Sequence, residues 1–334
     1  MVLRVLANFT VCLMRNEHLH APRGAAPTRT ERAHRFFGLC QHSEWFDIVV
    51  RLINNTNAGS TGAGSGRGDR NLSWRISGRT VSDHYIEFRN VSKSFDDHIV
   101  LDEVSFFVDT GQTCVIMGRS GVGKSVTLKH ILGFLAPDSG RVLVDGQDIT
   151  DWTEGQLMEV RRHVTMVFQS GALFDSLTVA ENIAFPLETR EDMTEEQKDT
   201  RVSELAEMLE VTNALDKLPS ELSTGTKRAV AIARALAQDP EAILYDEPTT
   251  MVDPLMAAHT GNLILRLKEK FHKTSVVVTH DTHLAKKLAD RVVFLHEGRV
   301  AYFGSWAGFE TAPEPFIQNF RRQDELIPAL DVTA

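Results

Sequence analysis

The stretch GRSGVGKS, residues 118–125, follows the apolar run TCVIM and precedes a helical pattern. It matches the spacing G-x-x-x-x-G-K-[ST], in which glycines let backbone N–H groups curl around phosphate oxygens. The lysine reaches the β- and γ-phosphates, and the hydroxyl after it binds Mg²⁺. Because a strand and a helix flank the stretch, a chance glycine-rich turn is the weaker interpretation. We predict a nucleotide-binding loop formed by Gly118, Arg119, Ser120, Gly121, Val122, Gly123, Lys124 and Ser125.

Strand-like and helix-like runs alternate along the chain around this loop. The runs at 85–95 and 101–108 alternate apolar and polar residues as half-buried strands do, whereas 113–118 is a continuous apolar run, as in buried parallel strands. No strong strand occurs at 170–222. The pattern predicts an α/β fold with a mainly parallel sheet, an antiparallel β subdomain and an inserted helical subdomain at about 170–222.

Composition and charge fit a folded protein and exclude some functions. The chain has 334 residues, 42% of them hydrophobic, which is enough for a core. The formal net charge of -9 argues against nucleic-acid binding, because phosphate backbones are held by clusters of Lys and Arg. Cys12, Cys40 and Cys114 show no metal-ligand spacing, so we expect a reducing cytoplasm. No run of about eighteen apolar residues occurs, so we expect any membrane role to require a partner chain.

Residues 1–82 differ in composition from the rest of the chain. Residues 1–82 hold scattered Arg and His and the Gly/Ser-rich segment AGSTGAGSGRGD, which is typical of a flexible linker. We expect a mostly disordered extension, or an artefact of the assigned translation start; a tethered interaction arm is the alternative. The ordered domain is predicted at 83–312, followed by a C-terminal tail at 313–334.

Two adjacent carboxylates end a buried strand in AILYDEP, residues 242–248. Such a pair usually lies in a solvated loop. Because this pair follows four apolar residues in a chain with a phosphate loop, it instead indicates the metal ligand and the general base of a nucleotide hydrolase. We expect Asp246 to hold magnesium through water and Glu247 to polarise the attacking water as a general base.

Two further polar residues end apolar runs. A lone histidine at a strand end, such as His280, is commonly structural, but a parallel sheet would place it beside Asp246 and Glu247. Gln169 follows the run VTMVF in the same way and could reach magnesium or the attacking water. We therefore predict catalytic roles for Glu247, His280 and Gln169, and magnesium binding by Ser125, Gln169 and Asp246.

The stretch ELSTGTKR, residues 221–228, opens an alanine-rich helical pattern. A hydroxyl followed by unpaired backbone N–H groups at a helix N-terminus can bind an anion, since the macrodipole is positive there. Taken alone, the stretch more often indicates an ordinary helix cap. The rest of the chain decides between the two.

The phosphate loop, Gln169, the stretch at 222–226, the run at 242–247 and His280 stand in a fixed order. Their order and spacing resemble the ATP-binding subunits of ABC transporters over about residues 85–310. The resemblance implies a P-loop NTPase of the ABC type with a RecA-like core. It also implies that the chain binds ATP and Mg²⁺ and hydrolyses ATP.

The resemblance assigns roles to residues outside the phosphate loop. Ser223 and Gly225 would belong to the signature motif, which binds the γ-phosphate of ATP held by the opposite subunit. Asp253 would lie in the loop that joins the two sites. Phe95 stands where the family stacks an aromatic residue on adenine.

The resemblance also implies an assembly. Family members form homodimers around two ATP molecules and drive separate membrane permease subunits, which would place this chain on the inner face of the cell membrane. In this chain Thr224 replaces the first glycine of the family pattern L-S-G-G-Q, and Thr226 replaces its glutamine. Whether Thr224 slows dimer closure is open.

A finer resemblance concerns the runs at 118–149 and 166–187, which look like the ATPase of Mla-type phospholipid transport systems. Those systems include a permease and an MCE-domain protein. Residues 170–174 would form part of a groove for a permease helix, or would simply pack the helical subdomain. The alternatives are the ATPase of another importer, for an amino acid or other small solute, and a soluble ABC protein acting on DNA or ribosomes. A non-hydrolysing scaffold would be expected to lack Glu247.

Overall fold

Strands form two sheets in the computed structural model, which describes residues 84–325. The expected extension at 1–82 lies outside the described residues. The strands are β1 (His84–Phe95), β2 (His98–Asp109), β3 (Thr113–Met117), β4 (Ser139–Val144), β5 (Gln147–Asp148), β6 (Val164–Val167), β7 (Ala242–Asp246), β8 (Thr274–Val278), β9 (Arg291–His296) and β10 (Arg299–Gly304).

The larger sheet has the order β10-β9-β3-β8-β7-β6. Strands β9, β3, β8, β7 and β6 are parallel, and β10 pairs antiparallel with β9. The smaller sheet has the order β2-β1-β4-β5, with antiparallel pairs throughout. The predicted fold class is confirmed, with a parallel core and a separate antiparallel sheet.

Helices connect the parallel strands, because parallel pairing requires a crossover connection. The helices of the described chain are α4 (Lys124–Ile131), α5 (Glu154–His163), α6 (Val179–Ala184), η2 (Phe185–Thr189), α7 (Glu195–Met208), η3 (Thr212–Ala214), η4 (Pro219–Glu221), α8 (Thr224–Ala237), α9 (Pro254–Phe271) and α10 (Thr282–Leu288), with α11 (Trp306–Glu310) and α12 (Pro315–Glu325) after the last strand. Between β6 and β7 the chain is helical, so the inserted segment separates two strands that are neighbours in the sheet.

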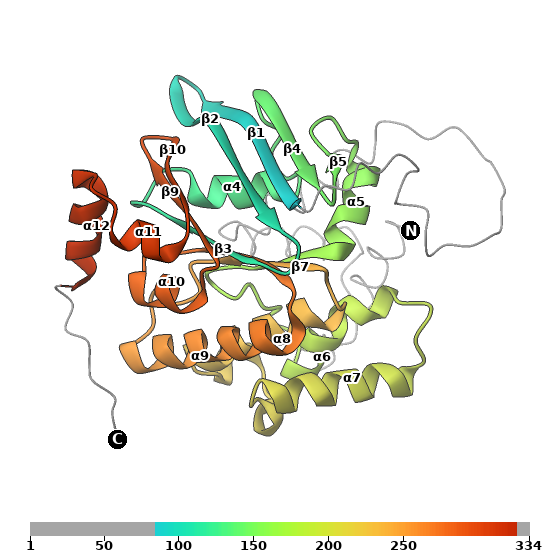
Figure 1. Ribbon diagram of the computed structural model, residues 1–334. Helices are drawn as coiled ribbons and strands as arrows, with labels where there is room; N and C mark the ends of the chain where they lie inside the picture. Colours follow the sequence, from blue (N-terminus) through green and yellow to red (C-terminus); the bar gives the residue numbers. More distant parts are fainter. Residues whose placement is uncertain (1–83, 326–334) are drawn as a thin grey trace, which may run out of the picture. The chain divides into compact units, whose positions relative to one another are not determined.

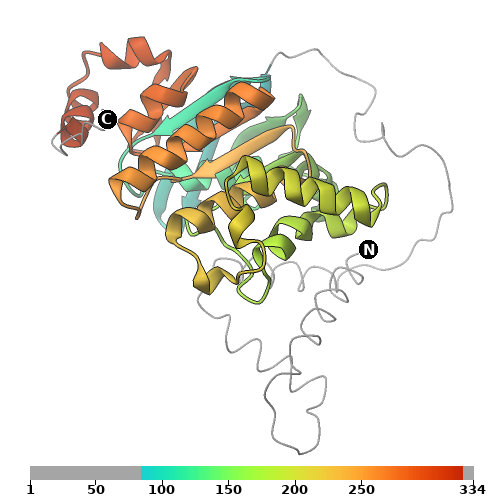
Figure 2. The same ribbon diagram turned by 90° about the horizontal axis from the view of Figure 1, so that it is seen from below.

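The parallel sheet carries a hydrophobic core on each face. On β3, Val115 and Met117 face a core shared with α8, α9 and α10, whereas Cys114 and Ile116 face a core shared with α4, α5 and the antiparallel sheet. Figure 1 shows the antiparallel sheet and α4 on one side of β3 and β7, with α8 and α9 on the other. Figure 2 shows α7 and α9, in yellow and orange, covering that second side.

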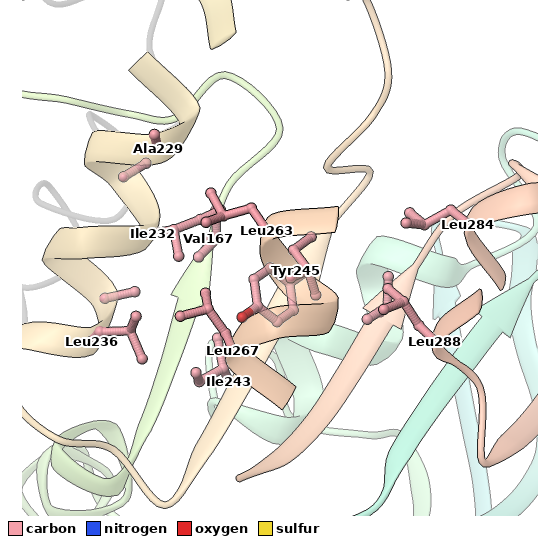
Figure 3. Close-up of a cluster of buried hydrophobic side chains, with 14 of the residues drawn as sticks. Val167, Ala229, Ile232, Leu236, Ile243, Tyr245, Leu263, Leu267, Leu284 and Leu288 are labelled. Atoms are coloured by element: carbon pink, nitrogen blue, oxygen red, sulfur yellow. The ribbon is translucent and has the colours of Figure 1, made fainter. Parts of the chain in front are cut away.

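The core under α8 is built from regularly spaced apolar side chains. Ala229, Ile232 and Leu236 recur at helical spacing and point toward β6 and β7, where Val167 and Ile243 lie (Figure 3). All five side chains are at most 7% exposed. Because interiors are close-packed, α8 is held firmly against the edge of the sheet.

The packed part of the chain continues beyond residue 312, the predicted end of the domain. Helix α12 buries Ile317 and Phe320, and Phe320 meets Phe294 of β9 with ring centroids 5.0 Å apart. The spacing of Phe316, Ile317 and Phe320 is the helical signal that marks this segment. In the described part of the chain, no helix has the length and apolarity needed to cross a membrane.

The burial of Cys114 gives a chemical test of the central strand. This side chain is 0% exposed, and desolvation raises the pKa of its thiol to about 12. Because the thiolate is the reactive form, we expect Cys114 to resist iodoacetamide at about pH 8 in the folded protein and to react after unfolding in guanidinium. Site-resolved mass spectrometry measures both rates, and equal rates would contradict the burial of β3.

Candidate functional site

The phosphate loop lies between β3 and α4, and its backbone requires glycine at specific places. Gly118 and Gly123 have φ angles of 149° and 105°. A Cβ on Gly118 would lie 2.5 Å from the carbonyl oxygen of Leu295, and one on Gly123 would lie 2.9 Å from that of Val100. Helix α4 begins at Lys124, so its unpaired first N–H groups adjoin the loop.

Lys124 crosses from the phosphate loop to the end of β7. Its Nζ donates to the carbonyl oxygens of Gly118, at 3.0 Å, and Arg119, at 3.2 Å. It also lies 3.3 Å from Oε1 of Glu247, and the two side chains are only 6% and 12% exposed. The ammonium group is therefore held inside the curl of the loop and beside the carboxylate predicted to act as a base.

Ser125 and Asp246 meet beneath the loop. The Ser125 hydroxyl donates to Oδ1 of Asp246 at 2.9 Å, and Asp246 is 9% exposed. A hydroxyl and a carboxylate are hard oxygen donors of the kind that Mg²⁺ uses with substrate phosphates and water. The described residues contain no group of three or more His, Cys, Asp or Glu side chains that could hold a metal ion. The donor chemistry of the Ser125–Asp246 pair fits a magnesium ion that also binds substrate phosphates.

Glu247 follows β7 in a turn of unusual backbone. Its φ is +48°, in the left-handed region, and its N–H donates to the carbonyl oxygen of Val278 at 2.9 Å. Oε2 accepts hydrogen bonds from the Thr250 hydroxyl, at 2.9 Å, and from Nδ1 of His280, at 2.8 Å. Because an ionised carboxylate only accepts, Nδ1 of His280 is the protonated ring nitrogen in this contact.

The surroundings of Glu247 determine its charge. Burial alone would raise the pKa of Glu247, but the hydrogen bond from His280, the charge of Lys124 and the Thr250 hydroxyl outweigh burial and lower the pKa below its ordinary value. The carboxylate is therefore ionised at neutral pH. An ionised carboxylate that is largely shielded from water can accept a proton from a water molecule placed beside it.

Gln169, which the sequence predicts to bind magnesium, lies at the margin of the site formed by Lys124, Ser125, Asp246 and Glu247. Gln169 is exposed in the turn after β6, and since Val167 pairs with Tyr245, that turn emerges next to the end of β7. Arg234 of α8 fixes the turn by donating to the carbonyl oxygens of Gly171 and Ala172 at 3.2 and 2.8 Å. The magnesium role of Gln169 stays a prediction.

Phe95 lies at the tip of the β1-β2 hairpin, opposite His98, and is 42% exposed. The hairpin is near the phosphate loop, because Val100 of β2 abuts Gly123. Lys93 lies over the Phe95 ring, 5.7 Å from its centroid. An exposed aromatic face at this position can stack on a base.

The signature stretch forms the N-terminus of α8. Ser223 is the N-cap, and its hydroxyl oxygen accepts from the N–H of Thr226 at 3.1 Å and shares a 2.8 Å hydrogen bond with the Thr226 hydroxyl. A Cβ on Gly225 would lie 1.9 Å from the terminal methyl carbon of Met256. The structure therefore gives Ser223 a capping role and Gly225 a packing role, both compatible with an anion at the helix end. Asp253 caps α9 by accepting from the N–H of Met256 at 3.0 Å.

Sequence reasoning missed two members of the site. Thr250 shares the Glu247 carboxylate, and Arg228 of α8 donates to backbone carbonyl oxygens of the Glu247 turn. Hydroxyls in the stretch EPTT after the carboxylate pair were the available signal for Thr250. No local pattern marks Arg228, because its partners are backbone atoms distant in the sequence.

Comparisons with known proteins agree with this geometry. A family model described as ABC transporter matches residues 101–250. The sulfate/thiosulfate import ATP-binding protein CysA of Synechococcus elongatus is 37% identical over 244 residues, covering 73% of this chain and 69% of that protein. The intermembrane phospholipid transport system ATP-binding protein MlaF of Haemophilus influenzae is 37% identical over 225 residues, covering 67% of this chain and 85% of that protein.

A solved structure shows the same arrangement of elements. A dimeric, post-hydrolysis state of an ATP-binding cassette with bound ADP and phosphate superposes with a TM-score of 0.60 at 33% sequence identity. The match covers 66% of this chain and 98% of that one.

The buried position of Lys124 predicts the effect of removing it. Lys124→Ala deletes the ammonium group inside the phosphate loop, so we expect at least about a tenfold loss of ATP affinity by equilibrium titration. Lys129→Ala, in the last turn of the same helix, is the matched control and should bind ATP as the parent does. Unchanged affinity in Lys124→Ala would contradict the phosphate-loop assignment.

Proposed function

This chain belongs to the ATP-binding proteins of ABC transporters and is an ATP hydrolase, and we propose that it hydrolyses ATP with Glu247 as its general base. The observation that carries the proposal is the ionised Glu247 carboxylate, 3.3 Å from the phosphate-loop Lys124. The two groups arise from different strand ends. The contact between Lys124 and Glu247 supports a site in which the base lies next to the bound phosphates.

The residues divide the chemistry among them. Lys124 binds the β- and γ-phosphates, which compete with Glu247 for its ammonium group and so release Oε1 toward water. Glu247 accepts the proton of the attacking water, while His280 and Thr250 hold the carboxylate in place. Ser125, Asp246 and Gln169 hold Mg²⁺, which neutralises the charge on the phosphates when bound. The contacts of Lys124 with Glu247 and of Ser125 with Asp246 support these proposed roles, and that of Gln169 comes from the sequence.

We propose a homodimer around two ATP molecules. Ser223 and Gly225 at the head of α8 face the ATP held by the partner, and Asp253 lies where the two sites adjoin. An unpaired helix N-terminus suits a γ-phosphate, since the partial positive charge there stabilises anions. Loss of that phosphate on hydrolysis weakens the contact, so the dimer can open and shift a membrane partner between states.

For the transported substrate we propose phospholipid, moved with a separate permease and an MCE-domain protein at the inner face of the cell membrane. The similarity to the phospholipid transport ATPase covers 85% of that protein. A surface for the permease is offered by the half-buried Leu173, Phe174 and Phe185, with the last two ring centroids 4.5 Å apart. Import of a small solute is the second candidate, favoured by the sulfate importer at equal identity.

Replacement of the base tests the hydrolytic mechanism. Glu247→Gln keeps the volume and a hydrogen-bonding group but cannot accept the water proton, so we expect loss of at least about a hundredfold in kcat. ATP-bound dimer should accumulate, because the γ-phosphate is retained. Steady-state ATPase assays and size-exclusion chromatography with Mg-ATP measure both effects. Hydrolysis at the parent rate would show that Glu247 is not the base.

Purification from membranes tests the partners and the substrate. We expect the tagged chain, extracted with detergent from its host, to retain a permease, an MCE-domain protein and phospholipid, identified by mass spectrometry. Phe174→Asp should lose the permease, because a charge disrupts an apolar contact, while the isolated protein keeps its ATPase rate. Recovery of a sugar- or amino-acid-binding protein instead would overturn the phospholipid proposal.

A further inference from the structure

Arg228 is a buried cation on the first turns of α8. It lies three residues after Gly225 and is 5% exposed. Burial lowers the pKa of its guanidinium, although an arginine remains charged at neutral pH. Burying a charge is costly unless polar groups replace the lost water, so the partners of this side chain indicate what it does.

Those partners belong to the turn that carries Glu247. One terminal nitrogen, Nη1, donates to the carbonyl oxygens of Glu247, at 3.2 Å, and of Pro248. The other, Nη2, donates to the carbonyl oxygen of Thr250. A planar guanidinium thus binds three backbone carbonyls of one turn, and its rigid fork fixes their relative directions.

The turn needs such an anchor, because its backbone is strained. Glu247 and Met251 have φ angles of +48° and +62°, which are unfavourable for residues with side chains. Carbonyl oxygens that converge in this way also repel one another, and a cation between them removes that repulsion. The anchor itself is rigid, since the apolar face of α8 is packed against β6 and β7 (Figure 3).

We propose that Arg228 is a positioning residue for ATP hydrolysis. It holds the backbone of residues 247–250 so that the Glu247 carboxylate stays between Lys124 and His280. This inference rests on the proposed function, because it takes Glu247 as the base. In this role Arg228 acts through the turn, to which all three of its hydrogen bonds go.

The same contact links two sites. In the proposed dimer the N-terminus of α8 meets the ATP of the partner, and Arg228 lies one turn further along the helix. Contact of α8 with the partner's ATP is therefore linked through Arg228 to the base that acts on the chain's own ATP. Hydrolysis at each site then depends on the position of α8 in the same chain.

Kinetics of paired variants test the inference. Arg228→Met retains the aliphatic stem and removes all three hydrogen bonds, so we expect kcat to fall at least about tenfold while KM and the ATP dissociation constant change less than about twofold. Arg228→Lys keeps the charge but cannot bridge the turn, and we expect an intermediate kcat. Arg201→Met is the matched control, because Arg201 of α7 donates to the carbonyl oxygen of Leu236 at the far end of α8. It should keep the parent kcat.

The outcomes separate this inference from the function on which it rests. A parent protein without ATPase activity, or a Glu247→Gln variant that hydrolyses at the parent rate, would refute the proposed function. An active parent with an inactive Glu247→Gln variant and an unchanged kcat in Arg228→Met would overturn the inference alone. A thermal melt checks folding. If Arg228→Met is unfolded, the folded Arg228→Lys decides: a reduced kcat supports the role, and the parent kcat overturns it.

Discussion

The contact between Lys124 and Glu247 joins the two halves of the site, and the rest of the structure serves to create it. Lys124 begins the helix after β3, and Glu247 follows β7, with β8 between the two strands. Parallel strands bring their carboxyl ends to one edge, so polar residues remote in sequence meet there. Hydrophobic cores on both faces fix the strands in register, and the ion pair is held at 3.3 Å with little exposure to bulk water. A buried pair of this kind is costly unless further hydrogen bonds complete it, and here the loop carbonyls, His280 and Thr250 do so.

Much of this could be predicted from the sequence, because the signals are local. A phosphate loop needs glycine at set spacings, and a buried parallel strand needs a continuous apolar run, so the sequence singles out Lys124, Ser125 and Asp246 without knowledge of the fold. His280 and Glu247 required one further step, the rule that parallel strands end together. The structure places Ser125 within hydrogen-bonding distance of Asp246, and it places Lys124 and His280 within ion-pairing or hydrogen-bonding distance of Glu247.

The remaining contacts could not be predicted from the sequence, because the partners of these side chains are backbone atoms, which no residue type marks. Arg228 binds carbonyl oxygens, which every residue carries, and their directions depend on a left-handed turn that a glutamate adopts against its usual preference. Arg234 likewise fixes the turn after Gln169 through the carbonyls of Gly171 and Ala172. Both arginines belong to α8, whose sequence shows only an apolar face with polar residues beside it. That one helix anchors two functional turns becomes evident only in three dimensions.

At the N-terminus of α8, a hydrogen bond between two side chains keeps a hydroxyl donor available although the signature stretch differs from the family pattern. Ser223 and Thr226 each carry one hydroxyl proton, and a single hydrogen bond of 2.8 Å joins them. Whichever hydroxyl donates in that bond, the other keeps its proton for an outside acceptor. The pair therefore presents one hydroxyl donor at the positive end of α8, next to N–H groups that have no partner within the helix. Thr226 stands where the family pattern has glutamine, and the pair still offers a hydroxyl donor suited to an anion. Thr224 is exposed, whereas Gly225 packs against Met256.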